Sequence, residues 1–97
     1  MIKIELLDAA ERDITYGFQF YEQQAEGLGA YFVDTILSDI ESLQLYAGIH
    51  ELHYRYHRLL SKRFPFAIYY RLNGNTARVY AVLDCRSNPR RLGERLT

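Results

Sequence analysis

The sequence predicts an α+β fold: an N-terminal strand, an antiparallel helical hairpin, three antiparallel strands (β-α-α-β-β-β) and a short C-terminal helix. Residues 2–6 alternate apolar and polar side chains, as half-buried strands do. Two segments with helical spacing flank Gly27-Leu28-Gly29, and Asn73-Gly74 separates two further alternating runs. With 97 residues, 48% of them hydrophobic, we expect one domain spanning residues 1–97.

The two helices of the hairpin are expected on either side of the glycine-rich segment. Asp8 is expected to cap the first helix, with Glu11 completing a capping box. Gly27 and Gly29 are expected to end it, because glycine readily adopts the left-handed conformation at a helix C-terminus. The second helix is expected over about residues 30–45. The apolar stripes are Ala10, Ile14, Gly17, Tyr21 and Ala25 in the first helix, and Phe32, Val33, Ile36, Leu37, Ile40 and Leu43 in the second.

Strands are expected over about residues 52–60, 66–72 and 76–84, and a terminal helix over residues 90–96. The Asn73-Gly74 pair predicts a hairpin between the last two strands, as in a type I′ turn. A two-residue loop would set Tyr70 opposite Ala77, and a four-residue loop would set Leu72 opposite Ala77. Strict alternation then turns one face toward the helices and leaves the other open. The expected helix face is Phe66, Ile68, Tyr70, Leu72, Ala77, Val79, Ala81 and Leu83, and the open face is Ala67, Tyr69, Arg71, Arg78, Tyr80, Val82 and Asp84.

Charge is divided unevenly along the chain, although its total is zero. Residues 1–49 hold two basic and nine acidic side chains, a net charge of −7, whereas residues 50–97 hold ten basic and three acidic ones, a net charge of +7. This division indicates that one surface meets an anionic partner. The single cysteine, Cys85, excludes an intramolecular disulfide and favours a reducing, cytoplasmic location, and no stretch approaches membrane-spanning length.

Histidines and an arginine are spaced two residues apart at His53, Arg55 and His57, and are expected on one face of a single strand. Two histidines flanking an arginine would provide acid, base and phosphate contact for RNA cleavage. The alternative is a polar face in solvent. A shared metal site is excluded, since residues 53 and 57 of one strand would lie about 13 Å apart, too far for one zinc ion.

Several segments, taken in their order and spacing, resemble the RelE/ParE toxin superfamily. They are Gly27-Leu28-Gly29 with Phe32, the run Arg63–Arg71 around Phe64-Pro65-Phe66, and the ending Ala81–Pro89 followed by Arg95-Leu96. The resemblance implies the toxin of a type II toxin–antitoxin module, also called a plasmid stabilisation protein, neutralised by a cognate antitoxin. ParE-like members, which inhibit DNA gyrase by binding and without a cofactor, are the closer match. A homodimer is compatible with the sequence but not required by it.

The alternative within the superfamily is a RelE-like, ribosome-dependent mRNA endoribonuclease. The basic set of that branch fits this chain poorly, since its strand arginine aligns with Ala67 and its C-terminal tyrosine with Leu92, while Arg86 matches. As a nuclease, the chain would use Arg58 and Arg86, with His57, to stabilise the transition state. A third alternative is an inactive relative that only binds an antitoxin.

The candidate surface for binding the target or the antitoxin is the basic open face. Arginine binds phosphate and carboxylate through a planar, permanently charged fork, and tyrosines beside it provide stacking platforms. The alternative is a solvated sheet face whose charges discourage aggregation at the edges. The candidate residues are Arg58, Lys62, Arg63, Tyr69, Arg71, Arg78, Tyr80, Arg86 and Arg90.

Overall fold

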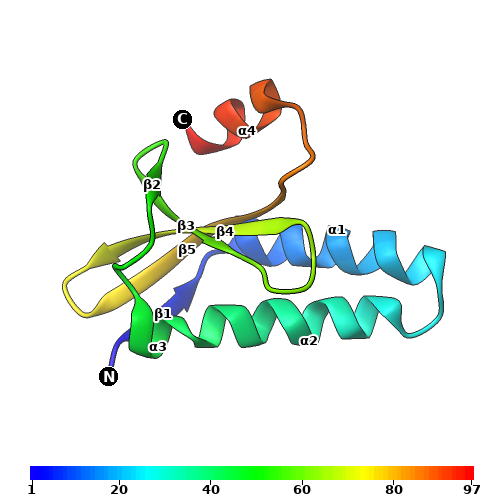
Figure 1. Cartoon of the computed structure of the whole chain (residues 1–97), viewed down its shortest axis with the longest axis horizontal. Coiled ribbons are helices and arrows are strands. Elements are labelled where there is room, and N and C mark those ends of the chain that lie inside the picture. Colours follow the sequence, from blue (N-terminus) through cyan, green and yellow to red (C-terminus); the bar gives the residue numbers. More distant parts are fainter.

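The computed structural model describes residues 1–97 and confirms the predicted α+β fold class. One five-stranded sheet, in the order β1-β5-β4-β3-β2, carries the hairpin of α1 and α2 on one face and α4 on the other (Figure 1). The sheet is mixed, because β1 runs parallel to β5 while the other pairs are antiparallel. The elements are β1 (Lys3–Leu6), α1 (Asp8–Gln24), α2 (Leu28–Glu41), α3 (Leu43–Tyr46), β2 (Leu52–His53), β3 (Tyr56–Leu60), β4 (Phe66–Asn73), β5 (Thr76–Asp84) and α4 (Pro89–Leu96).

The helical hairpin is held by glycine contacts and by one carboxylate. A Cβ at Gly17 of α1 would overlap the ring of Phe32 in α2, and one at Gly29 would lie 2.7 Å from the carbonyl oxygen of Phe18. The Glu22 carboxylate accepts the backbone N–H of Gly27 at 3.1 Å and that of Gly29 at 2.9 Å. These bonds satisfy amide groups at the start of α2 that have no partner within the helix.

The start of α1 differs from the prediction. Leu7, not Asp8, is the N-cap residue, and no side chain caps the helix. Asp8 is instead the first helical residue, so Asp8 and Glu11 both lie in the first turn. Carboxylates there stabilise a helix by interacting with the positive end of its dipole. The two acidic residues therefore support the helix start by a different contact from the one predicted.

The main core lies between the helical hairpin and the sheet. It confirms most of the predicted helix stripes, since Phe32, Ile36 and Leu43 are fully buried. The buried members of this core are Ala10, Ile14, Tyr21, Phe32, Ile36, Ile40, Leu43, Phe66, Ile68, Tyr70, Ala77, Val79 and Val82. A smaller cluster lies on the other face of the sheet, where Leu96 of α4 packs on Ala67, Tyr69 and Ala81.

A bulge in β5 changes the predicted faces of the sheet. Tyr69 pairs with Ala81 and Tyr70 with Val79, which leaves Tyr80 without a partner in β4. An extra residue in one strand reverses the direction of every side chain beyond it. The prediction is therefore right before Tyr80 and wrong after it. Val82 and Asp84 lie on the helix face, and Ala81 and Leu83 lie on the open face with α4.

Next to the turn, β4 and β5 adopt the second of the two predicted registers, since Leu72 pairs with Ala77, but the loop has two residues and not four. Asn73 still pairs with Thr76, so the two-residue turn is Gly74-Asn75. Of the two turn residues, only Gly74 has a positive φ, 57°. Glycine at the first turn position is the arrangement that a type II′ turn requires, so the predicted type I′ turn is wrong.

The predicted strand over residues 52–60 is a second, tighter hairpin. Tyr54 and Arg55 form its two-residue turn with φ values of 55° and 68°. His53 pairs with Tyr56, and His57 pairs with Leu52, so neighbouring strands carry the two histidines on opposite faces. The predicted common face of His53, Arg55 and His57 is therefore wrong.

Candidate functional site

The open face of the sheet gathers arginine and tyrosine side chains near the β2–β3 turn. The Arg71 guanidinium lies 4.0 Å from the ring centroid of Tyr56 and 5.5 Å from that of Tyr80. The two tyrosine rings meet edge to face at 5.1 Å. Stacking of a cation on aromatic faces holds the arginine in place while its charge remains available. We call this surface the arginine–tyrosine face; it consists of Tyr54, Arg55, Tyr56, Arg58, Arg71 and Tyr80.

Tyr69 is the member of the candidate set that is not accessible. It is 3% exposed and packs beneath Leu96 of α4. Burial raises the pKa of Tyr69, and the adjacent Arg58 on β3 opposes that shift. Tyr69 therefore supports α4 and orients Arg58, and it presents no surface to a partner.

Three of the candidate arginines are already neutralised by carboxylates. Arg78 lies 3.3 Å from Glu5 of β1, and Arg90 lies 3.7 Å from Glu94. Arg86 donates from Nε at 2.9 Å and from Nη2 at 2.7 Å to the two oxygens of Asp84. This fork keeps the pKa of Asp84 below its usual value, chiefly through the hydrogen bond. Part of the positive charge of residues 50–97 is therefore balanced by carboxylates of the same chain.

Lys62 and Arg63 lie apart from the arginine–tyrosine face, in the loop between β3 and β4. Together with Asp34 and Asp39 of α2, they line a small polar hollow. Arg63 donates to the hydroxyl of Tyr31 at 3.1 Å. The predicted basic set is therefore distributed over several surfaces. Arg58, Arg71, Arg78 and Tyr80 share the open face, and of these three arginines only Arg78 is paired with a carboxylate.

The residues assigned to a nuclease do not converge. His57 pairs with Tyr70 on the helix face of the sheet, whereas Arg58 pairs with Tyr69 on the open face. Arg86 follows the far end of β5 and is held by Asp84. The Nδ1 atom of His57 lies 2.7 Å from the carbonyl oxygen of His50, which can only accept, so Nδ1 carries the proton.

A network of histidine and tyrosine side chains lies on the helix face of the sheet, beside the β2–β3 hairpin. The hydroxyl of Tyr70 accepts the backbone N–H of Gly48 at 2.8 Å and contacts Nδ1 of His50. The Tyr70 hydroxyl accepts from Gly48, so its own proton remains available to donate. It therefore donates to Nδ1 of His50, which is the unprotonated ring nitrogen. Burial lowers the pKa of His50 below its usual value of 6.5, and the neighbouring His57 adds to the shift.

This network predicts a stability that falls in mild acid. His50 binds a proton less readily in the folded protein than in the unfolded chain, so its contribution is complete above about pH 6.5 and is lost as the pH falls below that value through the folded-state pKa. Urea unfolding between pH 8 and pH 5 measures it. His50→Asn keeps an acceptor for the Tyr70 hydroxyl and should show a smaller loss; equal losses in both proteins would contradict the assignment.

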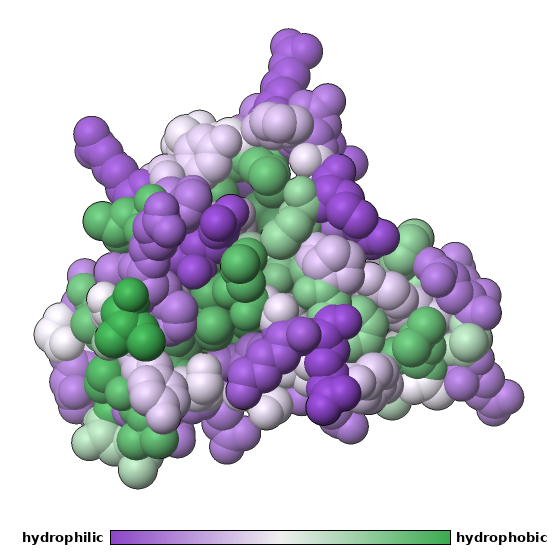
Figure 2. Space-filling view, in the orientation of Figure 1, coloured by the Kyte–Doolittle hydropathy of each residue, from purple (hydrophilic) through white to green (hydrophobic).

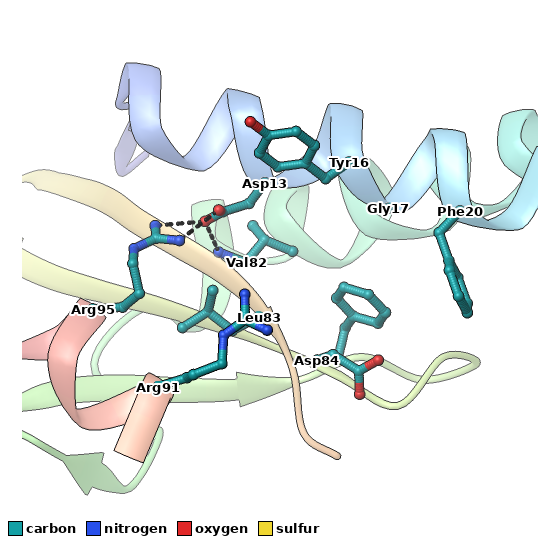
Figure 3. Close-up of a pocket in the computed structure, with 10 residues that line it drawn as sticks. Asp13, Tyr16, Gly17, Phe20, Val82, Leu83, Asp84, Arg91 and Arg95 are labelled. Atoms are coloured by element: carbon teal, nitrogen blue, oxygen red, sulfur yellow. Dashed lines mark hydrogen bonds and ion pairs between the residues drawn. The ribbon is translucent and has the colours of Figure 1, made fainter. Parts of the chain in front are cut away.

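A groove separates α1 from α4 and the end of β5 (Figure 3). It has a volume of about 400 Å³. Tyr16 and Phe20 of α1, which are 67% and 49% exposed, form its apolar wall. Arg91 of α4 reaches into it from the other side (Figure 3). We call this the Asp13 groove, after the carboxylate at its end.

Asp13 joins three elements that are distant in the sequence. Its oxygens accept the buried N–H of Val82 at 2.9 Å and two N–H groups of Arg95 at 2.7 Å and 2.9 Å. The carboxylate is 8% exposed, so both partners compensate a charge removed from water. The hydrogen bond to Asp13 raises the pKa of Arg95 above its usual value. Sequence reasoning missed this residue because its partners lie 69 and 82 positions away.

A third surface is apolar and lies at the α3 end of the molecule. Leu45, Tyr46, Ile49 and Leu52 are all more than half exposed. Figure 2 shows apolar side chains gathered over this end. None of the helices combines the length and apolarity needed to span a membrane.

Comparison with known proteins adds one informative match. No family model matches the chain, and no curated protein matches it. Among solved structures, it is similar to a chain of the structure described as the chromosomal ParDE TA system from P. aeruginosa, with a TM-score of 0.73 and 19% identity. The match covers 84% of this chain and 94% of that chain. The chain shares the fold of that ParDE-system chain, which we call the ParE-like fold.

The ParE-like fold confirms the resemblance predicted from the glycine, Phe-Pro-Phe and C-terminal segments. In the structure, each of these segments makes contacts that hold the fold together. Gly27 is the N-cap of α2, Gly29 packs within α2 against Phe18, and Phe64 packs against Phe32 with ring centroids 5.1 Å apart. Arg95 and Leu96 dock α4 on α1 and the sheet. The segments on which the resemblance rests therefore mainly form contacts that build the ParE-like fold.

Proposed function

We propose that this chain is the toxin of a type II toxin–antitoxin module that inhibits DNA gyrase by binding it, and that a cognate antitoxin neutralises it. The observation that carries the proposal is the ParE-like fold, which matches 94% of a chain from a ParDE system and 84% of this one. The toxin acts in the cytoplasm and requires no cofactor. Its contact surfaces are the helical hairpin and the basic residues of the second half.

The scattered arrangement of the basic residues supports binding over catalysis. Phosphoryl transfer needs several groups aimed at one reacting phosphate. His57 and Arg58 lie on opposite faces of the sheet, and Arg86 is paired with Asp84. The RelE-like alternative would require these three side chains to leave their present partners and converge.

The Asp13 groove supports the proposed antitoxin contact. Its wall of Tyr16 and Phe20 suits apolar side chains, and Arg91, which has no carboxylate partner within the chain, suits an acidic one. The two carboxylates that line the groove, Asp13 and Asp84, are neutralised by Arg95 and Arg86. An acidic, partly apolar segment of the antitoxin therefore complements the groove in charge and shape.

Pulse-labelling of bacteria tests the proposal. After induction of this chain alone, thymidine incorporation is expected to fall before amino-acid incorporation, and purified protein is expected to inhibit DNA supercoiling by gyrase. His57→Gln, which keeps a donor for the His50 carbonyl, is expected to retain toxicity because no proton transfer is needed. Arrest of protein synthesis first, with toxicity abolished in His57→Gln, would instead support the endoribonuclease.

A further inference from the structure

The arginine–tyrosine face contains a hollow of about 480 Å³ between the β2–β3 turn and the end of α4. That volume lies within the range of small-molecule sites. No aspartate or glutamate side chain lines it. The lining residues are Tyr54, Arg55, Tyr56, Arg71, Leu96 and Thr97.

The turn that forms one side of this hollow is built from unfavourable residues. Tyr54 and Arg55 both have a positive φ, at 55° and 68°, in a turn for which asparagine and glycine are the ordinary choice. Left-handed backbone costs a residue with a Cβ about 1 kcal/mol or more. The strain places an aromatic ring and a guanidinium side by side at the rim of the hollow.

The two guanidinium groups that line the hollow, those of Arg55 and Arg71, have no carboxylate partner. Neither Arg55 nor Arg71 forms an ion pair, in contrast to Arg78, Arg86 and Arg95. Arg71 donates only from Nε, to the carbonyl oxygen of Arg55 at 3.4 Å, so both of its Nη groups lack a protein acceptor. Stacking on Tyr56 at 4.0 Å fixes its position. Preorganised, unpaired arginines that face no aspartate or glutamate side chain are suited to a phosphate group.

Aromatic surface adjoins these charges. Tyr54 is 43% exposed at the rim, and Tyr80 lies within the same stack as Arg71. A planar ring can stack on tyrosine while an attached phosphate reaches the guanidinium groups. A carboxylate or phosphate alone would use the charges but leave the exposed ring of Tyr54 without a stacking partner. We infer that the hollow binds a nucleoside monophosphate, with its base against Tyr54 and its phosphate between Arg55 and Arg71.

Titration of the full chain with adenosine monophosphate, followed through tyrosine fluorescence and calorimetry, tests the inference. Saturable binding is expected, tighter than that of adenosine or of inorganic phosphate. Arg55→Gln and Arg71→Gln should each weaken it about tenfold, because each removes a charge-assisted contact. Arg90→Gln is the control and should not change it, since Arg90 pairs with Glu94 outside the hollow. Equal binding of phosphate alone, or no effect of the Arg71 variant, would overturn the inference.

A second variant separates binding from folding. Tyr54→Asn with Arg55→Gly replaces the strained turn with the preferred pair and is expected to raise Tm by about 4–8 °C while abolishing nucleotide binding. Unchanged binding in this more stable protein would contradict the inference. If a tetranucleotide binds more than tenfold tighter than the monophosphate, the inference is wrong and the hollow is instead part of a site for single-stranded nucleic acid. Gyrase inhibition is measured separately with the unsubstituted chain, where it does not depend on added nucleotide, so the two proposals can fail independently.

Discussion

Phe32→Ala is expected to lower the free energy of unfolding by about 3–5 kcal/mol, the range for removing a buried phenylalanine ring. The Phe32 ring is fully buried and lies 4.9 Å from Phe66 and 5.2 Å from Tyr21, centroid to centroid. It also fills the space in front of Gly17. Its loss would leave a cavity at the junction of both helices and the sheet.

Urea unfolding measures this effect, with Leu37→Ala as the matched control on the same helix. Leu37 is 44% exposed, so its truncation should cost clearly less than that of Phe32. Gly17→Ala provides a coupling test, because a Cβ there overlaps the Phe32 ring. It should be destabilising alone, by about 1–3 kcal/mol, and much less so in the Phe32→Ala background. Additive effects of the two substitutions would show that the ring does not occupy this position.

Asp13→Ala is the second large effect, with an expected loss of about 2–3 kcal/mol. The substitution leaves the Val82 N–H buried without an acceptor and frees Arg95. The expected loss is smaller than for a fully buried ion pair, because the Arg95 side chain is 39% exposed. The attachment of α4 should loosen as well, since Leu96 would then be the main remaining contact on the sheet.

Two related variants divide the effect of Asp13 into its parts. Asp13→Asn retains an oxygen for the Val82 amide and should lose less stability than Asp13→Ala. Arg95→Gln leaves the carboxylate buried with the Val82 N–H as its remaining charge-compensating contact, so it should also be destabilising. Hydrogen exchange of the Val82 amide provides a direct readout, with faster exchange in Asp13→Ala than in Asp13→Asn. Equal exchange in both would contradict the bond.

The helical hairpin shows how much local sequence can predict. The stripe of Phe32, Ile36 and Leu43 is buried as its spacing indicated. The predicted glycine stop is only partly right: α1 ends at Gln24, before the glycine segment, and Gly27 takes its positive φ as the N-cap of α2. Helical periodicity is a property of neighbouring residues, so it survives any tertiary arrangement that buries one face. The capping prediction at Asp8 was wrong because helix ends are set within one or two residues by contacts with the preceding chain.

The strands show where local patterns are insufficient. Strict alternation predicted the faces correctly up to Val79, but the bulge at Tyr80 exchanged the positions of Val82 and Leu83. Residues 52–60 read as one strand, although Tyr54 and Arg55 turn the chain without glycine or asparagine. Both features depend on pairing with other strands, and such pairing leaves little trace in the composition of one strand.

The candidate site likewise has features that the sequence predicts and features that only the tertiary structure determines. The sequence by itself determined the fold class, the helical hairpin and the concentration of arginine and tyrosine in the second half, because these follow from local spacing and counting. Only the tertiary structure decided which charges are free: Arg86 and Arg95 are paired, while Arg71 is not. Those pairings depend on distance in space, and the Asp13–Arg95 pair joins residues 82 positions apart.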